Sequence, residues 1–184
     1  MNPTQIFPRT LALYVTRRGI AFVCFVHPRM ILDWGTKEMR GKEKHEETLR
    51  MAKQVLDQFR PNVLVIENVE DRDTRRAPRI RLLYRAIAQY AEEQQIPTHA
   101  YSRPDITGVF AKIGASVKHE INCTIVQILP ALAAWQPRKR RAFDPETPAQ
   151  GIFDAAALGF TYFVQTKRID IAKAMQEEQI DREA

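Results

Sequence analysis

Hydrophobic and polar positions in the first part of the chain follow the pattern of β-strands. Residues 10–17 alternate with a period of two, which places the side chains of every second residue on one face. A short apolar run at 20–26 follows a turn that contains Gly19, and residues 30–34 form a third strand candidate. Because only short turns separate these segments, the pattern predicts an antiparallel meander of three strands.

Helical spacing of apolar residues then alternates with two further strands. Residues 43–59 carry an apolar face at helical spacing, and Pro61 ends that helix. Residues 63–69 form a continuous apolar run, which is typical of a strand that is covered on both faces. A second amphipathic helix is predicted around residues 80–91, and a short fifth strand at 96–101.

The last third of the chain is predicted to be helical. Residues 121–132 carry a stripe of large apolar side chains, residues 136–150 form a basic loop with prolines, and a final helix starts at about Gly151. The order βββαβαβ, then helices, predicts an α/β domain with a mixed five-stranded sheet and helices on its faces. We expect one domain over residues 1–167 and a weakly helical, charged tail at 168–184.

Composition narrows the class of protein. The chain has 184 residues, and 45% of them are apolar, which favours a globular fold over disorder. Its net charge of +6 is compatible with nucleic acid, with an anionic membrane or with solubility alone. Cys24 and Cys123 read as ordinary buried thiols in a reducing compartment, and the apolar run at 20–26 is too short to cross a bilayer. We expect a cytoplasmic protein without a membrane role.

Two carboxylates are candidates for chemistry. Glu67 ends a buried-looking strand, where a carboxylate must be solvated, paired or bound to a cation. In mixed sheets, sites lie at the carboxyl ends of strands where the chain order reverses, and Glu67 lies at such an end. The alternative is a carboxylate at the solvent-exposed edge of the sheet that is paired with an arginine. Asp154 lies at the start of the last helix, where the alternative is a first-turn acid that favours the helix dipole.

Basic side chains flank both carboxylates in sequence. One arginine-rich segment follows Glu67 and another precedes Asp154, so both segments frame one groove if the fold is right. Arginine suits phosphate because its guanidinium gives forked hydrogen bonds as well as charge. The alternative is a solvated basic face. The candidate nucleic-acid contacts are Arg72, Arg75, Arg76, Arg79, Lys112, Lys118, Arg138, Lys139, Arg140 and Arg141.

Three segments in order resemble RuvC-type Holliday-junction resolvases: DQFRPNVLVIENV (57–69), TGVFAKIGASVKHEINCTIVQIL (107–129) and FDAAALGFTYF (153–163). The resemblance spans roughly residues 9–165. It implies a ribonuclease-H-like fold, with Glu67 and Asp154 as catalytic residues and ligands of Mg²⁺ or Mn²⁺. It also implies a homodimer, since a resolvase cuts two strands related by a two-fold axis.

The sequence departs from that family at two carboxylate positions. Tyr14 stands where the first strand of the family carries a catalytic Asp, and Gly151 stands where its last helix often carries a second acid. A phenol that is protonated at neutral pH is a poor ligand for Mg²⁺. A single ion held by Glu67 and Asp154 would therefore bind weakly. The acids that could compensate are Glu70, Asp71, Asp73, Asp105, Asp144 and Glu146.

Three functions stay open from the sequence. The first is a RuvC-like nucleic-acid-binding protein, on DNA rather than RNA, with an incomplete metal–carboxylate site and weak or absent nuclease activity. The second is an active Mg²⁺-dependent endodeoxyribonuclease on branched DNA, or a related nuclease on structured RNA. The third is a protein-interaction scaffold that keeps only the fold.

Overall fold

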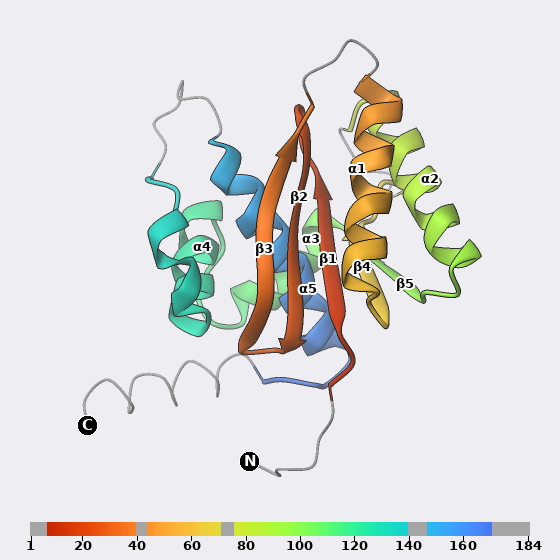
Figure 1. Cartoon of the computed structure of the whole chain (residues 1–184). Coiled ribbons are helices and arrows are strands. Elements are labelled where there is room, and N and C mark those ends of the chain that lie inside the picture. Colours follow the sequence, from red (N-terminus) through yellow and green to blue (C-terminus); the bar gives the residue numbers. More distant parts are fainter. Residues whose placement is uncertain (1–6, 40–43, 71–75, 140–146, 171–184) are drawn as a thin grey trace.

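The fold is a five-stranded mixed sheet covered by helices on both faces (Figure 1). The computed structural model describes residues 7–39, 44–70, 76–139 and 147–170. The strands lie in the order β3-β2-β1-β4-β5. The first three strands pair antiparallel, while β1 pairs parallel with β4 and β4 with β5, which confirms the predicted meander and mixed sheet. The strand bounds are β1 Thr10–Val15, β2 Gly19–His27, β3 Met30–Glu38, β4 Val63–Glu67 and β5 Thr98–Tyr101.

Alternation along β1 divides the core into two halves. Leu11 and Leu13 face a cluster that the buried sides of α1 and α2 complete. Ala12 and Tyr14 face the opposite cluster, which is built mainly from α3, α4 and α5. Figure 1 shows these two groups of helices on either side of the sheet. The helix bounds are α1 Lys44–Phe59, α2 Pro78–Glu93, α3 Arg103–Ala111, α4 Lys118–Ile128, the 3₁₀ helix η1 Pro130–Trp135 and α5 Pro148–Gln165.

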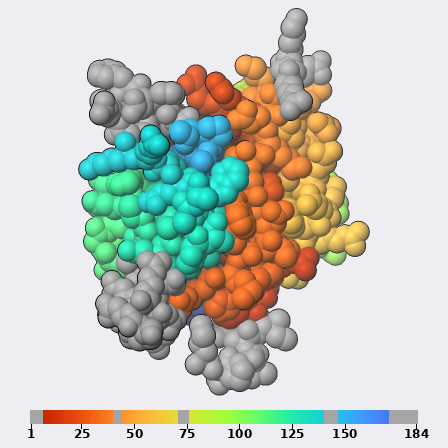
Figure 2. Space-filling view, turned by 60° about the vertical axis from the view of Figure 1, so that its left-hand side comes forward, coloured from red at the N-terminus to blue at the C-terminus, as the bar shows by residue number. Residues whose placement is uncertain are grey.

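Helix α5 is the central element of the second layer. Every residue from Gln150 to Phe163 is buried, because the helix is packed between the sheet and the α3–α4 region. Its small residues permit close approach: Gly159 lies so near to Phe25 of β2 that an added Cβ would come within 2.4 Å of the ring. In the space-filling view the α4–η1 segment lies beside the edge strand β3 (Figure 2).

The structure differs from the sequence-based expectations in several elements. Strand β4 ends at Glu67 rather than at residue 69, and β5 begins at Thr98 rather than at residue 96. Helix α3 was not predicted, although Ser102 and Asp105 form a capping box that marks its start. Strand β3 continues to Glu38, beyond the expected end at residue 34. Helix α5 begins at Pro148 rather than about Gly151, so Asp154 lies in the second turn and the first-turn explanation for this acid is wrong.

Cys24 is buried and Cys123 is half-buried, and both are free thiols. Within the described ranges, no helix has the length and apolar character needed to cross a membrane. Of the charged tail expected at 168–184, residues 171–184 lie outside the described residues.

Candidate functional site

A small pocket lies at the carboxyl ends of the parallel strands β1, β4 and β5. The last paired residues of β1 and β4 are Leu13 and Ile66, so Tyr14 and Glu67 come next at the same level. Glu67 in turn is paired with Tyr101 at the end of β5. Helices α3, α4 and α5 close the pocket from the other side. Its lining is Tyr14, Glu67, Arg103, Ile106, Lys118, Ile121, Asn122, Phe153, Asp154 and Ala157. The fold therefore brings Glu67, Asp154 and Tyr14 to one place, at the type of sheet end that the sequence indicated.

The carboxylate of Glu67 is held by two side chains of the chain itself. Arg76 donates from Nε to Oε2 across 2.7 Å, and its Nη2 forms an ion pair with the same oxygen. The hydroxyl of Tyr84 donates to Oε2 across 3.2 Å and accepts from the backbone N–H of Val15 at 2.8 Å. The hydroxyl of Tyr84 on α2 thus joins Glu67 of β4 to the backbone of β1.

The ionisation of these partners favours the same arrangement. Burial by itself lowers the pKa of Arg76, but the hydrogen bond to Glu67 and the nearby Tyr84 and Tyr14 raise it overall. Burial, followed by the negative charge of Glu67, raises the pKa of Tyr84 well above its usual value. Arg76 therefore stays cationic, and Tyr84 stays a neutral hydrogen-bond donor.

Tyr14, the expected replacement of a first-strand acid, contacts the same guanidinium. The Cζ atom of Arg76 lies 4.6 Å from the centroid of the Tyr14 ring, in a cation–π contact. The expected loss of a carboxylate at this position is therefore accompanied by a cation packed on the replacing ring. Arg76 connects Tyr14 and Glu67 into one neutralised unit.

Asp154 is also satisfied by groups of the chain. It is 7% exposed, and its Oδ2 lies 3.1 Å from Nζ of Lys118 at the start of α4. The amide of Gln150 donates to Oδ1 across 3.2 Å. Gln150 and Asn122 exchange two amide hydrogen bonds of 3.0 and 3.3 Å, which fasten α4 to α5. Sequence reasoning missed Gln150, Asn122 and Tyr84, because single polar residues inside apolar stripes carry no distinctive pattern.

Gly151 lies where the second acid of the last helix would fall, and this position has no room for a side chain. A Cβ atom there would come within 2.8 Å of the Cβ of Ala21 and 2.9 Å of Cγ2 of Thr16. Helix α5 therefore lies close against the β1–β2 hairpin, and an Asp or Glu at 151 would have to push the two apart.

The described residues do not fit a two-metal centre. Within the described ranges, no group of three or more Asp, Glu, His or Cys residues could hold a metal ion. Of the compensating acids, Asp105 accepts two hydrogen bonds from Ser102 at the cap of α3, and Glu70 pairs with Arg85 on the surface. The other four, Asp71, Asp73, Asp144 and Glu146, lie outside the described residues.

The candidate nucleic-acid contacts divide into several groups. Arg76 and Lys118 are turned toward Glu67 and Asp154, with 22% and 26% of their side chains exposed. Arg79 is half-buried, and its Nη1 has no hydrogen-bond partner among the described residues. The exposed cations among them are Lys112, Arg138 and Lys139, while Arg72, Arg75, Arg140 and Arg141 lie outside the described residues.

Arg103 was not among the predicted contacts, yet it lines the pocket. It is the first residue of α3, directly after strand β5. The sequence signal that could have identified Arg103 is the capping-box pattern Ser-Arg-Pro-Asp at 102–105. This pattern predicts that a helix begins directly after the fifth strand, with Arg103 in its first turn.

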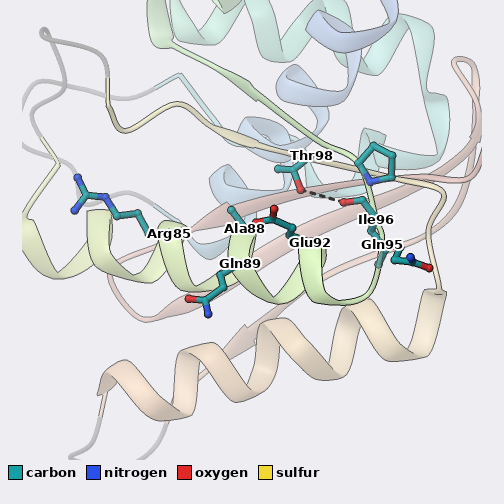
Figure 3. A pocket seen from close by; sticks show the side chains of 8 residues that line it. Arg85, Ala88, Gln89, Glu92, Gln95, Ile96 and Thr98 are labelled. Atoms are coloured by element: carbon teal, nitrogen blue, oxygen red, sulfur yellow. Dashed lines mark hydrogen bonds between the residues drawn. The ribbon is translucent and has the colours of Figure 1, made fainter.

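A second, larger pocket lies elsewhere on the surface, between the second half of α2 and the start of β5 (Figure 3). Arg85 and Glu92 are its charged residues, and the hydroxyl of Thr98 donates a hydrogen bond of 3.4 Å to the carbonyl of Ile96, another lining residue. Its lining includes neither Glu67 nor Asp154. The two candidate carboxylates thus both line the smaller pocket, at the carboxyl ends of the parallel strands.

No protein-family model matches this sequence, and no curated protein does so. Among solved structures, the chain is similar to Thermus thermophilus RuvC in complex with a Holliday-junction substrate, with a TM-score of 0.66, 17% identity and coverage of 88% of this chain and 96% of the other. It is similar to a second T. thermophilus RuvC structure, with a TM-score of 0.59, 17% identity and coverage of 86% and 96%.

A third similar structure is the yeast mitochondrial Holliday junction resolvase Ydc2, with a TM-score of 0.56, 14% identity and coverage of 94% and 86%. The chain thus has the mixed-sheet, ribonuclease-H-like fold of RuvC-type resolvases, as the three sequence segments indicated.

Proposed function

We propose that this protein binds nucleic acid, DNA in preference to RNA, and that it has weak nuclease activity or none. One observation carries the proposal: both carboxylates of the pocket are paired with cations of the chain, Glu67 with Arg76 and Asp154 with Lys118. A RuvC-like nuclease uses such carboxylates to hold divalent ions, and here guanidinium and ammonium groups already neutralise them.

A divalent ion would have to compete with these internal cations. Binding at Glu67 requires the loss of the ion pair with Arg76 and of its charge-assisted hydrogen bond, which contributes about 1.5–3 kcal/mol. Tyr14 offers a neutral phenol in place of a third carboxylate, and Mg²⁺ prefers charged or carbonyl oxygen ligands. We therefore expect Mg²⁺ or Mn²⁺ to bind at Glu67 and Asp154 weakly at most.

Support for nucleic acid as the partner comes from charge and from the shared fold. One of the similar structures is described as bound to a Holliday-junction substrate. Exposed cations of this chain, among them Lys112, Arg138 and Lys139, lie on the segments that border α3 and α4. A homodimer would suit a junction with two-fold symmetry, and we include it in the proposal.

The second candidate is an active metal-dependent endodeoxyribonuclease. This candidate is favoured because Glu67 and Asp154 line the same pocket, at the carboxyl ends of the central strands. It requires that substrate binding releases Arg76 or Lys118 and that further acids complete the site. A scaffold without nucleic-acid binding is the third candidate.

The test incubates the purified protein with a labelled four-way junction, duplex DNA, single-stranded DNA and hairpin RNA, with Mg²⁺, with Mn²⁺ or with EDTA. Binding and cleavage are scored in the same samples, beside a Glu67→Gln/Asp154→Asn variant. We expect salt-sensitive binding without cleavage. Divalent-dependent cleavage that disappears in the variant would establish the nuclease instead, and the absence of binding to every probe would favour the scaffold.

A further inference from the structure

Arg103 is the cation of the pocket that is not engaged by a carboxylate. Its side chain is exposed and lines the pocket together with Glu67, Lys118 and Asp154. Arg76 and Lys118 each pair with one of these carboxylates. Among the residues that the structure describes, the guanidinium of Arg103 forms no hydrogen bond or ion pair. Its five N–H donors are therefore available to a ligand.

The charge balance of the pocket favours an anion. Two carboxylates alone would repel a phosphodiester, and nucleases of this fold depend on divalent ions to reverse that repulsion. Here Arg76 and Lys118 offset Glu67 and Asp154, so the remaining positive charge is that of Arg103. Counted over the described residues, these three cations and two carboxylates thus leave a net positive charge without any bound metal ion.

The carboxylates are fixed in this neutralised state by neutral donors as well. Tyr84 donates to Glu67, and Gln150 donates to Asp154. Each carboxylate therefore has both a cationic and a neutral partner, which lowers its tendency to attract the guanidinium of Arg103. An arginine in this setting binds phosphate well, because its planar fork can reach two phosphate oxygens at once.

We propose that this pocket binds a backbone phosphate of a nucleic-acid strand without a divalent ion, and that Arg103 makes the direct contact. The inference rests on the proposed function, since it names Arg103 as the residue that contacts the nucleic acid and states that this contact needs no divalent ion. Arg76 and Lys118 serve as built-in counterions in the place where a nuclease would hold metal ions.

The test measures binding of a fluorescent four-way junction to the wild type, to Arg103→Gln and to a matched control, Arg50→Gln. Arg50 is an exposed residue of α1, on the opposite face of the sheet, and its substitution removes the same charge. Each dissociation constant is measured at several salt concentrations, once in EDTA and once in Mg²⁺ at equal ionic strength. Thermal melting confirms that both variants are folded.

We expect Arg103→Gln to weaken binding about tenfold and to reduce the slope of log Kd against log salt by about 1. Arg50→Gln should stay within about twofold of the wild type, and the wild type should bind equally well in EDTA and in Mg²⁺. Equal binding by Arg103→Gln and the wild type would overturn the assignment of Arg103 and leave the proposed function standing. Binding that disappears in EDTA would overturn the metal-free mode. A wild type that binds no nucleic acid would overturn both proposals.

Discussion

Arg76 joins Glu67 and Tyr14 into one unit: its Nε lies 2.7 Å from Oε2 of Glu67, and its Cζ lies 4.6 Å from the centre of the Tyr14 ring. Glu67 and Tyr14, the expected replacement of a first-strand acid, thus share a single guanidinium. In the proposed function, this guanidinium offsets the charge of Glu67 in place of a divalent ion.

Arg76→Leu should destabilise the protein by about 2–3 kcal/mol, because Glu67 would keep a mostly buried charge with the Tyr84 hydroxyl as its remaining partner among the described residues. The double variant Arg76→Leu/Glu67→Leu should lose less than the single variant, since it removes the uncompensated charge as well. Urea denaturation of both variants and of Glu67→Leu completes a double-mutant cycle. A single variant as stable as the wild type would show that the ion pair contributes nothing to stability.

Stability should fall as pH rises above about 10, with Tyr84 as one source. Burial and then the charge of Glu67 raise the pKa of Tyr84 in the folded state, so the unfolded chain loses this proton first. Ionisation then favours the unfolded state, by up to about 1.4 kcal/mol for each pH unit above the unfolded pKa.

The measurement of this effect is the free energy of unfolding between pH 8 and 11 for the wild type and Tyr84→Phe. The variant should be less stable at pH 8, because it loses hydrogen bonds to Glu67 and Val15, but its stability should decline less steeply with pH. Tyr101, whose pKa burial also raises, accounts for part of the remaining decline. Identical slopes for both proteins would contradict the assignment to Tyr84.

Gly151→Ala should destabilise the protein by about 1–3 kcal/mol, because the new Cβ would meet methyl groups of Ala21 and Thr16 at less than 3 Å. The matched control is Gly108→Ala in α3, where an added Cβ has no neighbour within 4 Å. That substitution should be neutral or stabilise by up to about 1 kcal/mol through helix propensity. Thermal melting of both variants compares the two positions. Equal changes in melting temperature would mean that α5 can move to accommodate a Cβ atom at residue 151.

Divalent ions should leave stability unchanged. With both carboxylates paired internally, 10 mM Mg²⁺ or Mn²⁺ should raise the free energy of unfolding by less than about 0.5 kcal/mol relative to NaCl of equal ionic strength. Differential scanning fluorimetry with increasing metal concentration measures the effect. A saturable rise of more than about 1 kcal/mol would establish a metal site in spite of Arg76 and Lys118.

The succession of strands along the chain, two amphipathic helices and the position of Glu67 followed from local patterns of the sequence. A period of two in β1 and a period of 3.6 in α1 and α2 reflect which faces must be buried, and this information is present in each segment. The end of β4 at a carboxylate likewise required no knowledge of distant residues. Helix α3 was missed because its marker, the cap between Ser102 and Asp105, is short and its apolar pattern is weak.

The state of the site was decided only by the tertiary structure. The resemblance predicted that Tyr14 replaces an acid, and the sequence has several arginines after Glu67, each of which could have turned to solvent or to the carboxylate. The choice of Arg76 depends on the packing of β1, β4 and α2, which places Glu67, Tyr14 and Tyr84 around one guanidinium. In the same way, the closeness of Gly151 to Ala21 depends on how α5 lies on the sheet. Such contacts join different segments of the chain. Local sequence patterns cannot predict them, because periodicity indicates only which face of a segment is buried.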